Sequence, residues 1–337
     1  MSEVHLLIVV IMSNSLPKVY LTRQMVPAVL DRLRPQCDLH INPVDDTLPR
    51  DELLSEVSDA VVLVPNGPDN IDAELLETAK DLKLIANFGV GYNNIDVDTA
   101  AKMGIPVTNT PGVLSDATAD IAWGLLMNAA RRIGEGDRMI RANAWPGWGP
   151  LQLLGGDITG ATLGLLGLGN IGKAMIPRAK GFSMDVIYWN RTRLDPAEEE
   201  ALGIRYGSKE EVLRTADYVS LHVALVPETR HLIGSEELAL MKPTAYLINT
   251  TRGPVVDEKA LVAVLQSGRI AGAGLDVYEN EPVVDPDLLP LENVLLAPHL
   301  GSATVGTRTR MGMIVADNIE AFLKGDPLLT CVNSPKG

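Results

Sequence analysis

The chain has 337 residues, of which 43 are acidic and 29 basic, so its formal net charge is −14 at pH 7. That length is sufficient for two domains with separate cores, and the acidic balance argues against nucleic acids and anionic membranes as partners. The two cysteines, Cys37 and Cys331, have no metal-like spacing, which predicts a reducing, cytoplasmic compartment without disulfides and without a metal site.

An apolar run occupies residues 4–12. It is too short to span a bilayer, and it lacks the basic start of a secretory signal. Two interpretations remain, an extra strand or an extension ahead of a natural start at Met12. We favour an N-terminal extension over residues 1–17, because residues 18–22 already have the pattern of a first strand.

Residues 18–110 alternate between short apolar runs and segments with helical spacing. We predict strands at 18–22, 60–65, 84–87 and 106–108, and helices at 26–34, 49–56 and 73–81. This alternation is typical of a parallel sheet with helices on its faces.

A long helix is predicted over 116–133, with Ser115 or Asp116 as its cap. The alternation then begins again, with strands at 162–166, 186–189, 218–221, 245–249, 272–275 and 294–297. A last helix at 305–323 is expected to pack back on the first unit. The predicted fold is α/β, with two Rossmann-like doubly wound parallel-sheet domains and a cleft between them. Its parts are a discontinuous substrate domain at 18–112 plus 300–330 and a dinucleotide-binding domain at 113–299.

A Gly-x-Gly-x-x-Gly turn connects the predicted strand at 162–166 to a helical segment. In such a turn the first glycine permits the tight bend, the second lets phosphates approach, and the third lets helix and strand pack closely. The turn alone is also compatible with a plain glycine-rich loop, but the strand that follows at the right distance favours a dinucleotide site. The residues concerned are Gly167, Leu168, Gly169, Asn170, Ile171 and Gly172. Pro177 is expected to kink or end the following helix, at a cost of about 3 kcal/mol if uncompensated.

The end of the next strand indicates which cofactor is used. NAD-binding folds usually carry an acidic residue there, whereas this chain has Asn190, followed by Arg191, Thr192 and Arg193. The missing carboxylate removes repulsion of a 2′-phosphate, and the guanidinium and hydroxyl groups can donate to it. We therefore predict a preference for NADPH, with NADH still possible. The alternative is that both arginines are solvated surface charges.

Segments 249–257, 274–282 and 297–304, together with the glycine turn, resemble the D-isomer-specific 2-hydroxyacid dehydrogenases. The resemblance covers nearly all of the chain from residue 18, and segments 87–96 and 109–120 make it most similar to the glyoxylate/hydroxypyruvate reductase and 2-ketogluconate reductase group. It implies NAD(P)H-dependent reduction of small 2-oxo acids to D-2-hydroxy acids by a homodimer. Glyoxylate and hydroxypyruvate are the first candidates and 2-ketogluconate a further one.

The chemistry of this reduction requires a proton donor and a cation that binds the substrate. His299 can donate the proton as an imidazolium, Glu281 can orient that ring and favour its charged form, and Arg252 can bind the carboxylate and polarise the carbonyl. The resemblance assigns the same three roles. Taken singly, each residue could instead have a structural role. His299 could be a hydrogen-bonded histidine of the surface or core, Glu281 a carboxylate that caps a turn, and Arg252 a surface charge.

The resemblance also implies further contacts. The N–H groups of Val90 and Gly91 should hold the substrate carboxylate, and Trp148 should reach the pocket of the other subunit, or else only pack the dimer. The cofactor contacts that it implies beyond the glycine turn are Thr118, Val223, Pro227, Thr229, Thr250, Thr251, Asp276 and Gly301.

Other functions stay open at this stage. Related enzymes oxidise formate or phosphonate, although the formate enzymes typically carry Gln where Glu281 stands. A phosphoglycerate dehydrogenase often adds a regulatory domain, for which this chain ends too soon. A nucleotide-sensing corepressor shares the fold and can keep the same three residues.

Overall fold

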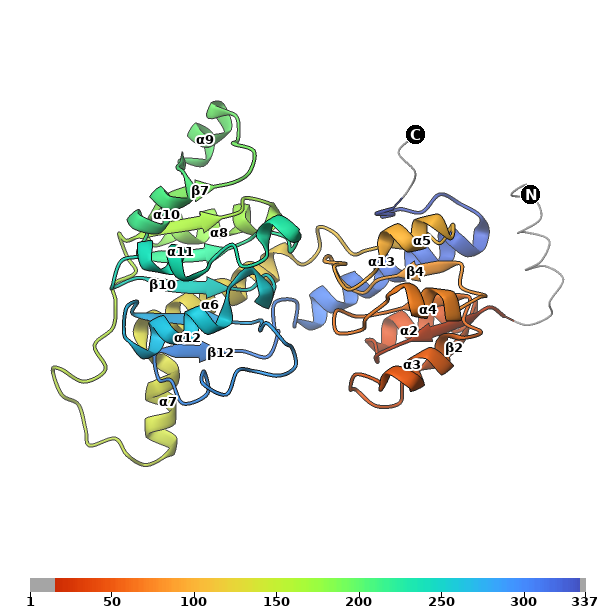
Figure 1. Cartoon of the computed structure of the whole chain (residues 1–337), viewed down its shortest axis with the longest axis horizontal. Coiled ribbons are helices and arrows are strands. Elements are labelled where there is room, and N and C mark those ends of the chain that lie inside the picture. The colour runs from red at the N-terminus through yellow and green to blue at the C-terminus, as the bar shows by residue number, and fades with distance from the viewer. Residues whose placement is uncertain (1–15, 334–337) are drawn as a thin grey trace. The chain divides into compact units, whose positions relative to one another are not determined.

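The computed structural model describes residues 16–333, which divide into two compact units (Figure 1). One unit contains the described residues up to Leu114 and those from Ala303 onward, and the other contains Ser115–Ser302. The apolar run at residues 4–12 lies outside the described residues.

The first unit is built on a five-stranded parallel sheet of order β2-β1-β3-β4-β5. Its strands are β1 (Lys18–Leu21), β2 (Asp38–Ile41), β3 (Val62–Val64), β4 (Leu84–Ala86) and β5 (Val107–Thr108). Every residue of β3 and β4 is apolar and buried, as expected for strands covered on both faces. Its helices are α2 (Pro27–Leu33), α3 (Arg50–Val57), α4 (Ala73–Thr78), α5 (Val97–Lys102) and α13 (Val305–Lys324).

The side chains of β1 alternate between the two faces of this sheet. Val19 and Leu21 lie in a cluster with residues of α2 and α13, whereas Tyr20 lies in a second cluster with residues of α3, α4 and α5. Val315 and Ile319 of α13 are fully or almost fully buried in the first cluster. The C-terminal helix therefore forms part of the core of the unit that contains the N-terminal strands.

The second unit contains a seven-stranded parallel sheet of order β12-β11-β10-β9-β6-β7-β8. Its strands are β6 (Thr162–Leu166), β7 (Asp185–Trp189), β8 (Arg205–Tyr206), β9 (Tyr218–Leu221), β10 (Tyr246–Asn249), β11 (Gly272–Leu275) and β12 (Val294–Leu296). The direction in which strands are added reverses between β6 and β9. In such sheets ligands bind beyond the carboxyl ends of the strands at that point.

Two helices precede the first strand of this unit, and the others lie between its strands along the chain. They are α6 (Ser115–Arg131), α7 (Ile133–Arg141), α8 (Asn170–Gly181), α9 (Pro196–Leu202), α10 (Lys209–Thr215), α11 (Ser235–Leu240) and α12 (Glu258–Gln266), with short 3₁₀ turns at Pro227–Thr229 and Gly253–Val255. Within residues 16–333, none of the helices is both long and apolar enough to cross a membrane.

The prediction of two parallel-sheet α/β domains is confirmed. Every strand expected from the sequence is present to within a few residues. The predicted helix at 116–133 is wrong in its last residues, because Arg132 adopts a left-handed conformation (φ 54°) that separates α6 from α7. Strands β2 and β8 and helices α5 and α7 were not predicted from the sequence.

Pro177 does not end α8, so one of the two effects expected of it, a kink or an end of the helix, is contradicted. The helix continues to Gly181. Pro177 lies on the exposed side, while Ile176 and Ala179 are buried in the core beside β6 and β7. On that side water can bind a carbonyl oxygen that lacks an amide partner, so the packing of the buried side holds the later turns of the helix in place.

Candidate active site

The glycine turn after β6 has the geometry of a phosphate-binding loop. Gly167 has φ +95°, and a Cβ there would lie 2.5 Å from the carbonyl oxygen of His222, while a Cβ on Gly172 would lie 2.5 Å from that of Gly167. The packing of the chain itself therefore requires both glycines. A Cβ on Gly169, the N-cap of α8, would meet no atom within 4 Å. Gly169 thus leaves space beside the first N–H groups of α8, which fits a pyrophosphate at this position.

The segment after β7 is fixed at both of its ends. Asn190 accepts a hydrogen bond from the N–H of Leu168 (3.4 Å) and donates one to the carbonyl of Thr192 (2.9 Å). Arg193 forms a two-point ion pair with Glu199, with N···O distances of 2.8 and 2.7 Å. The guanidinium of Arg193 also lies 5.2 Å from the ring centroid of Tyr206.

Glu199 was not identified from the sequence, although it is the residue that holds Arg193. Its carboxylate is buried and also accepts the hydroxyl of Tyr188 at 2.6 Å. The hydrogen bonds from Arg193 and then Tyr188 lower the pKa of Glu199 to about 2, so the charge of Arg193 is paired at neutral pH. Arg191, in contrast, is exposed and has no hydrogen bond or ion pair with any other residue of the described chain.

His299 and Glu281 are in direct contact in the second unit. Nδ1 of His299 lies 2.8 Å from Oε2 of Glu281, and Oε1 of Glu281 accepts the N–H of Tyr278 at 3.0 Å. An ionised carboxylate can only accept, so Nδ1 carries a proton in this pair and Nε2 remains for a ligand. The imidazole is about half exposed, which leaves Nε2 accessible.

The carboxylate of Glu281 is ionised at neutral pH. Burial raises its pKa, but the hydrogen bond and charge of His299, the N–H of Tyr278 and the charge of Arg252 together bring it below its usual value. The ionised carboxylate therefore faces Nδ1 as a hydrogen-bond acceptor and fixes the orientation of the ring.

Asp276 and Thr118 fix the loop that carries His299. The two carboxylate oxygens of Asp276 accept hydrogen bonds from the N–H groups of Leu300 (2.6 Å) and Gly301 (2.8 Å). The backbone carbonyl of Asp276 accepts a hydrogen bond from the N–H group of His299 (3.0 Å). Thr118 donates to the carbonyl of Gly301 at 3.1 Å. Burial raises the pKa of Asp276, against the effect of the Leu300 N–H, the His299 charge and the Gly301 N–H. In this structure Asp276 is a positioning residue for His299.

Arg252 lies on a turn after β10 that Asn249 organises. The side-chain oxygen of Asn249 accepts both the N–H and the hydroxyl of Thr251 (3.0 and 2.7 Å), and its NH₂ donates to the carbonyl of Arg252 (3.1 Å). Burial lowers the pKa of Arg252, and the charge of Glu281 opposes this effect. An arginine remains protonated throughout the usual pH range, so a half-buried cation lies in the field of Glu281.

Gly253 explains why the turn with Arg252 can lie against the segment that leads to Glu281. A Cβ on Gly253 would lie 1.9 Å from the carbonyl of Tyr278, a distance that only glycine permits. The structure thus brings Arg252, Glu281 and His299 together in one unit. Three residues that shape the site were missed in the sequence, because their roles depend on contacts that no motif encodes. They are Asn249 in its own turn, Gly253 against Tyr278, and Glu199 with Arg193 and Tyr188.

The remaining residues of the implied cofactor site lie at the carboxyl ends of β9 and β10. The Thr250 hydroxyl is buried and has no hydrogen-bond partner among residues 16–333, and an unpaired buried hydroxyl at this place fits a polar group of a ligand. Thr229 accepts the N–H of Val226 (2.9 Å) and donates to the carbonyl of Ala224 (2.7 Å), so it shapes the loop that contains Val223 and Pro227.

Burial lowers the pKa of His222 to about 3, so this histidine is neutral beside the glycine turn. Its Nε2 lies 2.9 Å from the hydroxyl of Ser220.

Three further residues were expected to bind the substrate, namely Val90, Gly91 and Trp148. Val90 and Gly91 belong to the loop after β4 in the first unit. Trp148 lies on the loop after α7 and is 84% exposed. Trp145 on the same loop donates to the side chain of Gln152 at 3.2 Å.

A cavity of about 230 Å³ lies away from these groups, at the amino ends of β10, β11 and β12. Its charged lining residues are already paired, Arg132 with Glu135 and Arg138 with Glu292. Since ligands of α/β sheets bind at the opposite, carboxyl ends of the strands, this cavity is not the candidate active site.

Comparison with known proteins agrees with this geometry. Residues 123–301 match the model of the D-isomer specific 2-hydroxyacid dehydrogenase NAD-binding domain. A glyoxylate reductase of Thermococcus litoralis is 49% identical over 314 residues, which cover 92% of this chain and 95% of that protein.

Two solved structures are similar over most of their length. A glyoxylate reductase from Paecilomyes thermophila has a TM-score of 0.82 at 38% identity, over 95% of this chain and 99% of that one. An NADPH-dependent glyoxylate/hydroxypyruvate reductase from Sinorhizobium meliloti, solved with NADP and malonate, has a TM-score of 0.82 at 36% identity, over 94% and 97%.

Proposed function

The chain belongs to the D-isomer-specific 2-hydroxyacid dehydrogenase family, and from this membership we propose that it reduces glyoxylate, hydroxypyruvate and similar small 2-oxo acids to D-2-hydroxy acids. The observation that carries this proposal is the contact between Nδ1 of His299 and the Glu281 carboxylate in the field of Arg252. An imidazole whose Nδ1 is hydrogen-bonded to a carboxylate and whose Nε2 is accessible is suited to donate a proton to a carbonyl oxygen.

The cofactor site proposed here consists of the glycine turn at 167–172 and the carboxyl ends of β7, β9 and β10. The space beside Gly169 and the unpaired hydroxyl of Thr250 fit a dinucleotide. The bound cofactor supplies a hydride to the substrate. The N–H groups at the start of α8 bind its pyrophosphate, and Asn190 fixes the segment that meets its adenosine.

The protein provides charge and proton transfer for this reduction. Arg252 binds the substrate carboxylate and stabilises the negative charge that develops on the carbonyl oxygen. Nε2 of the His299 imidazolium donates a proton to that oxygen, and Glu281 stabilises the charged ring until then. The N–H groups of Val90 and Gly91 hold the carboxylate, and Asp276 keeps His299 in place through the loop 299–301.

The reaction is tested directly with a panel of 2-oxo acids at saturating NADPH. Glyoxylate and hydroxypyruvate are expected to be reduced fastest, and hydroxypyruvate is expected to give the D isomer of glycerate. An L product, or oxidation of formate in place of these reductions, would contradict the proposal.

The cofactor preference proposed here is for NADPH over NADH. Its support is the asparagine at the end of β7, followed by Arg191, whose guanidinium has no bond to the rest of the described chain. A 2′-phosphate meets no carboxylate at Asn190 and can bind Arg191 and the Thr192 hydroxyl.

Arg191→Ala is expected to weaken NADPH binding by about 10- to 100-fold, the effect of losing one charge-assisted hydrogen bond, and to leave NADH binding unchanged. The dissociation constants of both cofactors, measured by fluorescence titration, test this. Because the charge of Arg193 is already paired with Glu199, Arg193→Ala is expected to weaken NADPH binding less than Arg191→Ala does. Arg205→Ala, which removes an exposed arginine paired with Glu211, is the control. An equal loss of both cofactors would show that Arg191 is structural.

Glu281→Gln is expected to move the pH profile of the reduction rate to lower pH. The rate falls when the proton donor loses its proton, and a neutral amide no longer stabilises the imidazolium as the Glu281 carboxylate does. Turnover numbers from pH 5 to 9 measure the shift. The paired carboxylate Glu211→Gln, on the surface next to Arg205, serves as the control. An unmoved profile in Glu281→Gln would contradict this pairing.

We also propose a homodimer. Helix α7 has no buried residue, and Ile133 and Ile140 on it are more than half exposed. The following loop exposes Trp148 and Leu151, the latter by 82%. So much apolar surface is typical of an interface, and a second copy of the chain is the proposed occupant. Sedimentation velocity tests this, and a monomer at all concentrations would contradict it.

A further inference from the structure

Three consecutive carbonyl groups in the loop after β4 are held by side-chain amides. The NH₂ group of Asn87 donates to the carbonyl oxygens of Gly89 (3.1 Å) and Gly91 (2.9 Å). The NH₂ group of Asn109 donates to the carbonyl of Val90, which lies between them, at 2.9 Å. The N–H of Thr110 is a second donor to Gly89, at 3.0 Å.

This arrangement determines where the N–H groups of the loop point. In a trans peptide the C=O of one residue and the N–H of the next point in opposite directions. The peptide bonds of this loop are trans, since the cis bond of the described chain is Glu281–Pro282. Holding the three carbonyls therefore directs the N–H groups of Val90, Gly91 and Tyr92 away from the two asparagines.

These three N–H groups are available to a ligand. None of them donates a hydrogen bond to another residue of the part of the chain that the structure describes. The side chains of Val90 and Tyr92 are exposed, so the loop is accessible. Neighbouring backbone N–H groups that lack a partner on an accessible loop can bind an anion such as a carboxylate.

We propose that Asn87 and Asn109 are positioning residues for the substrate carboxylate: together they form an amide clamp that turns the N–H groups of Val90, Gly91 and Tyr92 toward it. This inference rests on the proposed function, which places the carboxylate of a 2-oxo acid at Val90 and Gly91. It adds the residues that set the donor geometry and Tyr92 as a third donor.

The clamp is fixed before any substrate binds. Asn87 is 1% exposed, its amide orientation follows from its two carbonyl partners because only NH₂ can donate, and its backbone N–H is bonded to Thr108 of β5. A donor set that is held in advance needs little reorganisation when the charged ligand arrives.

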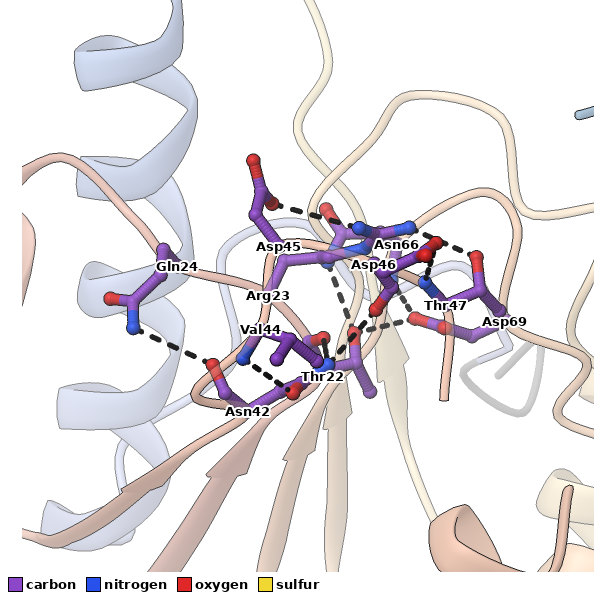
Figure 2. A network of polar contacts seen from close by, with 10 residues as sticks. All are labelled: Thr22, Arg23, Gln24, Asn42, Val44, Asp45, Asp46, Thr47, Asn66 and Asp69. Carbon is purple, nitrogen blue, oxygen red and sulfur yellow. Dashed lines mark hydrogen bonds and ion pairs between the residues drawn. The ribbon is translucent and has the colours of Figure 1, made fainter. Parts of the chain in front are cut away.

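A second polar network holds the loop from its other end. Asn94 donates to the carbonyls of Asn66 and Asp69, both at 2.9 Å. Figure 2 shows Asn66 and Asp69 directed toward Thr22 at the end of β1, where the hydroxyl of Thr22 donates to Asp69 at 2.5 Å. The same network extends to Asn42 and Arg23 (Figure 2). Both ends of the loop that contains Val90 and Gly91 are thus held at the carboxyl ends of the strands of the five-stranded sheet.

Steady-state kinetics with glyoxylate, together with NADPH binding, tests the clamp. Asn87→Ala and Asn109→Ala are each expected to raise the KM for glyoxylate about tenfold or more, with a change of less than about threefold in kcat, because the donors contact the carboxylate and not the reacting carbon. The double variant is expected to raise KM further. The dissociation constant of NADPH is expected to stay unchanged, since the residues proposed to bind it lie in the other unit.

Two further variants make the result specific. Asn87→Asp keeps the shape of the side chain but replaces the NH₂ donor by an acceptor, so it is expected to raise KM at least as much as Asn87→Ala. Asn70→Ala, which removes an exposed asparagine bonded to Asp72 in the same unit, is the control and is expected to leave KM unchanged. Asn109 is only half-buried, so Asn109→Ala still tests the clamp if the Asn87 variants do not fold.

An unchanged KM for glyoxylate in Asn109→Ala would contradict the clamp. A higher KM that comes with a lower kcat, a weaker affinity for NADPH and a lower melting temperature would also contradict it, since these changes together indicate a general structural loss. A wild-type protein that reduces no 2-oxo acid contradicts the proposed function instead. In that case protection of the Val90 and Gly91 amides from hydrogen exchange by added oxalate, lost in Asn109→Ala, would still support the clamp, and its absence would refute it.

Discussion

His299→Ala is expected to lower the turnover number for hydroxypyruvate reduction by about 10²–10⁴-fold, the contribution of a positioned general acid. In the structure Nδ1 of His299 contacts Glu281, and Nε2 is accessible for the proton transfer that we propose. Alanine removes this donor, and water must then protonate the developing alkoxide. The dissociation constant of NADPH is expected to change little, because His299 lies outside the glycine turn and the segment after β7 that are proposed to bind the phosphates.

His40→Ala is the matched control for this experiment. His40 also lies beside a carboxylate, Asp38, at 3.0 Å, but on the surface of the first unit. Its removal is expected to leave turnover unchanged. If His299→Ala retained more than about a tenth of the wild-type turnover number, another group would have to be the acid.

Arg252→Ala is expected to reduce kcat/KM by about 10²–10³-fold, the effect of removing one strong donor to a developing oxyanion. KM is expected to rise and kcat to fall, because the guanidinium is proposed to contact both the carboxylate and the carbonyl oxygen. Arg252→Lys keeps the charge but cannot form two parallel hydrogen bonds, so an intermediate loss is expected.

The measurement for Arg252 is a full substrate series at saturating NADPH for each variant. Arg34→Ala removes an exposed arginine and is the control for a general loss of positive charge. A change confined to KM would place Arg252 on the carboxylate alone, and unaltered kinetics would remove it from the site.

The sequence was sufficient to predict most of the sheet framework. β3, β4, β6, β9 and β11 are short runs of buried, mostly apolar residues, which are visible in one dimension. β2 and β8 were missed because they are edge strands with exposed or half-buried residues, so they lack the apolar signal. The break at Arg132 was missed because the amphipathic pattern continues across it, and its left-handed conformation has no signature in the sequence.

The residues of the candidate site divide in a similar way. Arg252, Glu281 and His299 could be identified because they lie in motifs and have chemistry that the reaction needs. Glu199 and Asn87 could not, because their importance lies in contacts with specific partners in the fold. Glu199 pairs with Arg193 and Tyr188, and Asn87 with two backbone carbonyls that no sequence pattern encodes. The same contacts distinguish Arg193, whose charge is paired, from Arg191.

The most direct test of the central claim is the initial rate of hydroxypyruvate reduction, measured over concentration series of NADPH and of NADH. Fast turnover with a higher kcat/KM for NADPH is the predicted result, and it would support both the reaction and the role of Asn190 and Arg191. Turnover that favours NADH would keep the reductase and contradict the phosphate site. No turnover of hydroxypyruvate or glyoxylate with either cofactor would contradict the assignment of a 2-oxo acid reductase.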